Sequence, residues 1–147
     1  MSDHRIVFMR GLPGCGKSTE IQKRFPGAKP APQAKITDPV ICSMDHYFLD
    51  SVGDYVFDLK RIGAAAAFCQ KHVFWSLLRG RDLIIVDNTH TQHWEMDLVK
   101  TMARAYGYLI ETVDLFDGGL SDEELAARNA HGVPVEIIAQ MRARWEK

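Results

Sequence analysis

Apolar residues along the chain gather in four short runs, which are separated by longer segments of mixed character. Short, unbroken runs of this kind that are rich in Val and Ile are typical of buried β-strands. The sequence therefore predicts strands at residues 5–10, 40–44, 83–87 and 108–116.

The intervening segments carry helix signals. After Asp58, which can cap a helix, apolar residues recur at helical spacing until Gly80 ends the pattern. "SDEE" is a capping box, in which Ser121 and Glu124 satisfy each other's end of a helix. A further helix is predicted to carry Trp94, Leu98 and Met102 on one face. The predicted helices begin at Lys17, Asp58, Thr91, Ser121 and Pro134, and signals that end them lie at Pro26, Gly80, Gly107, the "HGVP" segment and Trp145.

Two segments show no period and are predicted to be loops, residues 26–39 and residues 45–58. Strands that alternate with helices build a parallel sheet with helices on both faces, so the fold class is α/β. Ligands of such sheets bind at the carboxyl ends of the strands. The polar residues with chemical potential fall there, at 11–19, Asp45 and 87–89.

Length and charge narrow the possible functions. The 147 residues suit one domain. The net charge of −1 argues against a broad basic surface that binds nucleic acid, although a local basic groove remains an alternative. Three unpaired cysteines, no leader pattern and no long apolar run indicate a cytoplasmic protein, or one of the host cytoplasm if a phage encodes it.

The stretch "GLPGCGKST" joins the first predicted strand to the first helix and has Walker A spacing. Glycines let backbone N–H groups point at phosphates, Lys17 reaches the β- and γ-phosphates, and the Ser18 hydroxyl can ligate Mg²⁺. Cys15 is interpreted as a small filler, with a redox switch as the alternative because Lys17 and the helix start favour the thiolate. The residues predicted to hold ATP are Gly11, Pro13, Gly14, Cys15, Gly16, Lys17, Ser18 and Thr19.

Two carboxylates follow the second and third strands. Asp45 faces the γ-phosphate side and could take the proton of a hydroxyl acceptor, or it could simply cap a turn. Asp87 closes "LIIVD" in the manner of a Walker B strand and could hold Mg²⁺ or its hydration water; the alternative is a turn residue.

Other side chains are predicted around these groups. Arg128, late in the chain, could close over the phosphates or be an exposed helix arginine. A zinc site at His90 and His93 lacks a third ligand. The aromatic residues after Asp45 could be core or could stack a base. The residues predicted to touch the acceptor are His46, Tyr47, Asn88 and Thr89, with His90 on the same rim.

Together, "GLPGCGKST", "CSMDHYF", "VDNTHTQHWEM" and "RNAHGVP" resemble the polynucleotide kinase-like P-loop kinases over nearly the whole chain. The resemblance implies a P-loop NTPase-type sheet of about four to five strands flanked by helices, with a C-terminal helical lid. It implies Asp45 as the general base, Lys17 and Arg128 as phosphate contacts, and transfer of the ATP γ-phosphate to a hydroxyl of nucleic acid, DNA more than RNA.

The sequence departs from the kinase domain of bacteriophage polynucleotide kinase, a member of this family, in residues on the acceptor side. His46 replaces an acidic residue, Phe48 an arginine, and His131 with Gly132 stands where a second lid arginine is found. The chain is also similar to phage kinases that phosphorylate 5-hydroxymethyluracil in DNA, so a 5′-hydroxyl end and a base-borne hydroxyl both stay open. Two other functions remain: a small-molecule kinase, whose acceptor binding would depend little on salt, and a nucleotide-binding regulatory module without transfer.

Overall fold

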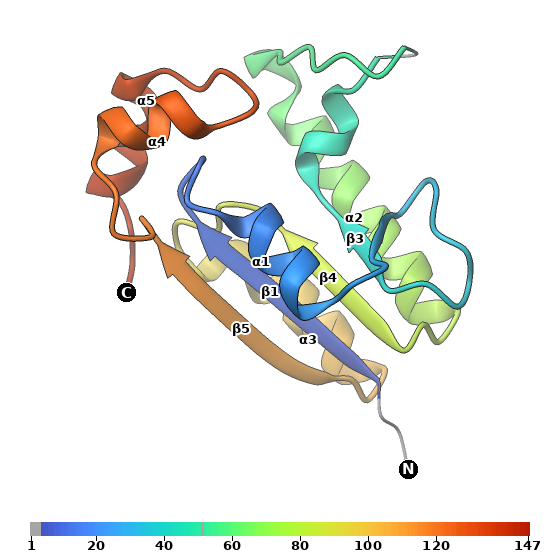
Figure 1. Ribbon diagram of the computed structural model, residues 1–147. Helices are drawn as coiled ribbons and strands as arrows, with labels where there is room; N and C mark the ends of the chain where they lie inside the picture. Colours follow the sequence, from blue (N-terminus) through green and yellow to red (C-terminus); the bar gives the residue numbers. More distant parts are fainter. Residues whose placement is uncertain (1–3, 51) are drawn as a thin grey trace.

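The four predicted strands all form, and a fifth, very short one joins them (Figure 1). The computed structural model describes residues 4–50 and 52–147; residues 1–3 and Ser51, the latter in the predicted 45–58 loop, lie outside the described residues. All the strands are parallel, in the order β2-β3-β4-β1-β5, so the strand that leads into the Walker A stretch has a neighbour on each side. The strands are β1 (Arg5–Gly11), β2 (Lys29–Pro30), β3 (Val40–Cys42), β4 (Leu83–Asp87) and β5 (Leu109–Phe116).

Helices cover both faces of the sheet. Buried side chains of α2 and α3 pack with Phe8 and Ile84 on one face, and α1 packs with Val7 and Ile85 on the other. Helices α4 and α5 lie together beyond the carboxyl end of β5 (Figure 1), where Leu125 and Ile138 form a third cluster with the Walker A stretch. The helices are α1 (Lys17–Arg24), α2 (Ile62–Leu78), α3 (Asp97–Ala105), α4 (Asp122–Arg128) and α5 (Val135–Ala143). The α/β class with a parallel sheet is therefore confirmed.

The helix after residue 91 differs from its prediction. Gln92, not Thr91, is the cap, and it forms a capping box with Glu95 around a 3-10 turn, η3 (His93–Met96), so that α3 begins only at Asp97. The predicted apolar face is wrong at Trp94 and Leu98, because this turn changes the phase, whereas Met102 is partly buried against the core as predicted. Trp94 and Leu98 are 68% and 55% exposed, whereas the buried residues are Met96, Val99 and Ala103.

The two predicted loops contain short ordered elements. Residues 26–39 include β2, which is only two residues long and has no apolar run to announce it. Residues 44–48 form the 3-10 helix η1 (Met44–Phe48), capped by the Ser43 hydroxyl, and η2 (Leu59–Arg61) is capped by Asp58 as predicted.

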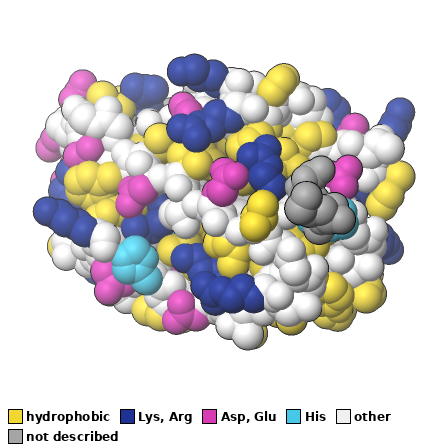
Figure 2. Space-filling view, turned by 90° about the horizontal axis from the view of Figure 1, so that it is seen from below, with side chains coloured by type: hydrophobic (Ala, Val, Ile, Leu, Met, Phe, Trp, Pro, Cys, Tyr) yellow, Lys and Arg dark blue, Asp and Glu magenta, His cyan; other side chains and the backbone are white. Residues whose placement is uncertain are grey.

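The outer surface carries charges of both signs. In the view from below, basic, acidic and hydrophobic side chains are interspersed on one face, with no broad basic area there (Figure 2). Within residues 4–50 and 52–147, no helix combines the length and the apolar character that crossing a bilayer requires.

Candidate active site

The Walker A stretch forms a tight turn from the end of β1 into α1. Gly14 and Gly16 have φ angles of 82° and 106°, in the left-handed region that glycine tolerates. A Cβ on Gly14 would lie 2.5 Å from the carbonyl oxygen of Leu125. The turn therefore requires glycine there because α4 lies directly against it.

Lys17 and Cys15 have different roles within this turn. The Lys17 ammonium donates to the carbonyl oxygen of Gly11 at 2.8 Å and lies at the wall of the adjacent cavity. Cys15 is buried, and a Cβ on Gly11 would collide with its sulfur. Burial raises the pKa of the Cys15 thiol despite the nearby Lys17 charge. These observations favour the filler interpretation over a reactive thiolate.

A cavity of about 1140 Å³ opens beside the turn. It lies between the Walker A stretch, η1, the end of β4 and the segment from Arg128 through α5. Gly11, Cys15 and Tyr47 are the predicted site residues that do not line it. Those that line it are Pro13, Gly14, Gly16, Lys17, Ser18, Thr19, Asp45, His46, Asp87, Asn88, Thr89 and Arg128.

Asp45 lies at the start of η1, where Ser43 Oγ accepts from the Asp45 backbone N–H at 3.1 Å. The Tyr55 hydroxyl donates to Asp45 Oδ1 at 3.3 Å, and His131 Nε2 lies 3.4 Å from Oδ2. Burial raises the pKa of Asp45, but His131, Lys17 and Tyr55 outweigh it, so the pKa lies below its usual value. Asp45 is therefore a carboxylate at neutral pH.

Asp87 is buried at the end of β4. Its Oδ1 is a buried oxygen that has no hydrogen-bond partner among the described residues. Burial raises the pKa of this carboxyl, and the Asp45 charge adds to the effect while Lys17 opposes it. A buried carboxylate oxygen without a partner is costly unless a cation completes the site. Hard oxygen donors of this kind fit Mg²⁺, and Ser18 supplies a hydroxyl on the same cavity.

The predicted acceptor contacts divide into two groups. His46 faces the cavity, and burial lowers the pKa of its ring. Asn88 also lines the cavity, and its Oδ1 accepts from the Met44 backbone N–H at 2.9 Å, which attaches η1 to the end of β4. The Tyr47 ring packs on Phe68, outside the cavity, and its hydroxyl accepts from Arg61.

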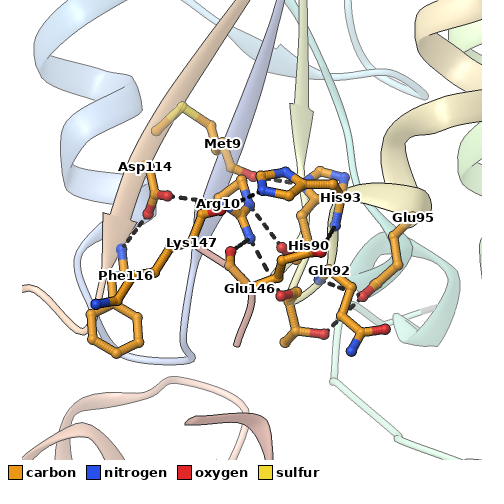
Figure 3. Close-up of polar contacts among 11 residues, drawn as sticks. Met9, Arg10, His90, Gln92, His93, Glu95, Asp114, Phe116, Glu146 and Lys147 are labelled. Atoms are coloured by element: carbon orange, nitrogen blue, oxygen red, sulfur yellow. Dashed lines mark hydrogen bonds and ion pairs between the residues drawn. The ribbon is translucent and has the colours of Figure 1, made fainter. Parts of the chain in front are cut away.

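The residues after β4 tie the turn to the end of the chain. The Gly11 N–H donates to the Thr89 carbonyl at 3.1 Å. His90, at φ 46°, is buried and directs Nδ1 at the Met9 carbonyl, whereas His93 directs Nε2 at the Lys147 carbonyl (Figure 3). No cluster of three or more metal-ligating residues occurs in the described parts of the chain, which leaves the zinc alternative without support.

A buried arginine organises this region (Figure 3). Arg10, 1% exposed, donates to the carbonyl oxygens of His90 and Glu146 at 2.8 and 2.6 Å and pairs with Asp114 at 2.9 Å. Its guanidinium lies 4.4 Å from the centre of the Trp145 ring. The strand end that begins the Walker A turn is thus fixed to β5 and to the C-terminal segment.

Arg128 is the last residue of α4 and is exposed at the rim of the cavity. Its side chain makes no hydrogen bond or ion pair with the described residues, so the guanidinium is available to a ligand. Of the aromatic residues after Asp45, Phe48, Tyr55 and Phe57 line the cavity; Phe48 is largely buried, whereas Phe57 is 49% exposed.

Sequence reasoning missed His131. In the sequence it stands only where a related kinase has a second lid arginine, yet its ring reaches Asp45. The signal was its place in "RNAHGVP", between two predicted helices and three residues after Arg128. The sequence could place His131 near the phosphates, but its partner comes from a segment 86 positions away, which no local pattern encodes.

Comparisons with known proteins identify the family of the chain. A family model described as "AAA domain" matches residues 6–147. Human NEDD4-binding protein 2 is 33% identical over 147 residues, which is 97% of this chain and 8% of that protein, so the chain spans a small part of this relative.

Two solved structures share the fold. A chain of the Pnkp1/Rnl/Hen1 complex superposes with a TM-score of 0.58 at 21% identity, over 85% of this chain and 38% of that one. The APS kinase CysC of Mycobacterium tuberculosis, as a Cys556Ala mutant, gives a TM-score of 0.50 at 13% identity, over the whole of both chains. The fold is thus kinase-like.

Proposed function

The chain belongs to the AAA domain family, and we propose that it is an ATP-dependent phosphotransferase of the polynucleotide kinase-like group. The proposed acceptor is a hydroxyl of nucleic acid, either a 5′ end or the hydroxymethyl group of a modified base such as 5-hydroxymethyluracil in DNA. The observation that carries the proposal is that Lys17, Asp45 and Asp87 line one cavity. We place this activity in the cytoplasm, because the three cysteines of the chain are buried and free, which suits a reducing compartment.

The residues divide the chemistry between them. Walker A N–H groups and Lys17 bind the phosphates of ATP, and Arg128 approaches them from the rim. Asp45 takes the proton of the acceptor hydroxyl while the hydroxyl oxygen forms a bond to the γ-phosphorus. The bond between the γ-phosphorus and the β–γ bridging oxygen breaks, and ADP leaves. Ser18 and Asp87 would hold Mg²⁺, which supplies neutralisation of phosphate charge when bound.

Part of the acceptor side of the cavity is apolar. Phe57, Leu59 and Ile62 line it, and none of the lining residues from 43 to 99 is a lysine or an arginine. Such a wall suits a flipped-out base, which stacks on aromatic rings. The same feature favours a second candidate, a small-molecule kinase that acts on a nucleoside, because a long polyanion would gain little from this wall.

The test is a transfer assay with γ-labelled ATP, Mg²⁺ and a panel of acceptors. The panel contains 5′-hydroxyl DNA and RNA, duplex DNA with hydroxymethyluracil, and free nucleosides. We expect label on DNA, and we expect Asp45→Asn to lower transfer by about 10²- to 10⁴-fold with ATP binding retained. Lys17→Ala, as the contrasting variant, is expected to lose ATP binding.

Other results would change the assignment. Label only on nucleosides, with an acceptor KM that does not vary with salt, would establish the small-molecule kinase instead. Slow hydrolysis with no labelled acceptor would leave a nucleotide-binding module. Full transfer by Asp45→Asn would remove Asp45 as the base.

A further inference from the structure

The segment between α4 and α5 reaches across the cavity to the proposed base. His131 lies in this segment, and its Nε2 is 3.4 Å from Asp45 Oδ2. The Tyr55 hydroxyl donates to the other oxygen, Oδ1, at 3.3 Å. Both oxygens of the Asp45 carboxylate are therefore contacted. One contact comes from the lid, which comprises α4, α5 and the segment between them (residues 121–143), and the other comes from the loop after η1.

The two groups that hold Asp45 also hold each other. The Tyr55 and His131 rings pack with centroids 4.0 Å apart and planes inclined by 31°. One face of the imidazole consequently packs on Tyr55 while its Nε2 edge points at Asp45. This packing restricts the orientation of the ring relative to the carboxylate.

This contact is also the polar link between the lid and η1. Among the described residues, the His131–Asp45 pair is the hydrogen bond or ion pair that joins residues 121–143 to residues 40–60. The rest of the lid rests on the Walker A turn through Leu125 and Ile138. The orientation of Asp45 is thus connected to the position of the lid through one side chain.

We propose that His131 is a positioning residue that orients the Asp45 carboxylate when the lid lies over the cavity. The inference rests on the proposed function, in which Asp45 is the base. Lid placement over bound ATP and preparation of the base then occur together, because Arg128, the last residue of α4, and His131 lie only three residues apart.

The electrostatics of the surrounding groups agree. The contact with Asp45 raises the pKa of His131; burial and Lys17 oppose this, and Asp87 adds to it. The same contact helps to lower the pKa of Asp45, whereas the nearby His46 ring, itself disfavoured as a cation, adds no competing charge at neutral pH. At pH values between the lowered pKa of Asp45 and the raised pKa of His131 both side chains are charged and form an ion pair. Outside that pH range one of them is neutral and the ion pair is lost.

The first test is an NMR titration of side chains, which needs no acceptor. In wild type the His131 signal, assigned by its absence in His131→Gln, is expected to titrate at higher pH than in Asp45→Asn. Reciprocally, the Asp45 carboxyl is expected to titrate at higher pH in His131→Gln than in wild type. An identical His131 titration in wild type and Asp45→Asn would overturn the inference.

The second test measures transfer as a function of pH. His131→Gln is expected to lower kcat by about 10- to 100-fold with little change in the KM for ATP, and to move the acid limb of the pH profile to higher pH. His131→Arg, which keeps a cation at this position, is expected to restore the acid limb. His72→Gln is the matched control, since His72 packs on Phe68 and Trp75.

A Gln variant with full kcat and an unmoved acid limb would overturn the positioning role. If wild type transfers phosphate to no acceptor, the proposed function fails. The NMR titrations then decide separately whether His131 holds the Asp45 carboxylate.

Discussion

At the scale of single residues, the site keeps groups that are unfavourable for the folded chain alone. Asp87 has a buried carboxylate oxygen without a partner among the described residues, and burial raises the pKa of this group. A carboxyl whose pKa is higher in the folded state lowers stability at pH values where it must be ionised. Its retention at the end of β4 fits a role with a cation, not a role in folding.

Asp87→Asn is therefore expected to stabilise the folded protein while weakening its binding of ATP with Mg²⁺. Without nucleotide or metal at pH 7, the free energy of unfolding is expected to rise by about 1–3 kcal/mol, since an unpaired buried charge is removed. The gain shrinks as pH falls through the raised pKa of Asp87, because wild type then carries a neutral carboxyl. Urea denaturation at several pH values measures this.

The exposed Asp54→Asn is the control and is expected to change stability by less than about 0.5 kcal/mol. In Asp87→Asn, binding of ATP with Mg²⁺ is expected to weaken. A loss of stability at pH 7 in this variant would show that the carboxylate is satisfied within the folded chain.

At the scale of elements, the strands and helices that have local sequence signals were predictable. The helix boundaries and contacts that connect one segment to another were not. The apolar runs predicted four strands, and "SDEE" predicted α4, because their signals are local. The start of α3 was wrong because Gln92 and Glu95 form a capping box one residue after Thr91. Strand β2 was missed because two residues, one of them Pro30, carry no period.

The site shows the same division. The Walker A residues and Asp45 follow from motif and position, and the cavity brings Lys17, Asp45 and Asp87 to one place. Asn88, predicted to touch the acceptor, lines the cavity and also accepts from the backbone N–H of Met44, which the sequence did not predict. Its role depends on the pairing of β3 with β4, and such a contact is set by the tertiary structure.

The capping box of α4 offers a test of how the lid supports the nucleotide site. Ser121 Oγ accepts from the Glu124 N–H at 3.2 Å, and the carbonyl of Leu125 in the same helix lies against Gly14. Ser121→Ala is expected to destabilise α4 by about 1 kcal/mol. Hydrogen exchange in residues 122–128 is expected to quicken and the Kd for ATP to rise.

Ser121→Asn keeps a capping oxygen and is expected to behave like wild type. Unchanged exchange and unchanged ATP affinity in Ser121→Ala would mean that packing of Leu125 alone holds the helix in place.

At the scale of the whole molecule, Arg10 joins parts that are far apart in sequence. It donates to His90 and Glu146 and pairs with Asp114, so β1, the segment after β4, β5 and the C-terminal segment meet at one side chain. Lysine cannot reproduce this fork of donors. Arg10→Lys is expected to lower the free energy of unfolding by about 3 kcal/mol, because buried carbonyl groups lose charged partners.

Arg5→Lys provides the comparison on the same strand. Arg5 pairs with Glu111 at 3.0 Å, but both side chains are about two-fifths exposed (40% and 44%). The change is expected to cost less than about 1 kcal/mol. Urea denaturation with an unchanged m-value measures both variants, and equal effects would contradict a central role for Arg10.

The strand order has a consequence for the time course of synthesis. Strand β1 carries the Walker A turn, yet its two neighbours begin at Leu83 and Leu109. A ribosome that adds about 5–20 residues per second needs roughly 5–20 s to travel from Gly11 to the end of β5. During that interval the nascent chain holds an apolar strand without its full set of partners, and the strand that carries the Walker A turn gains its second neighbour only after β5 has been made.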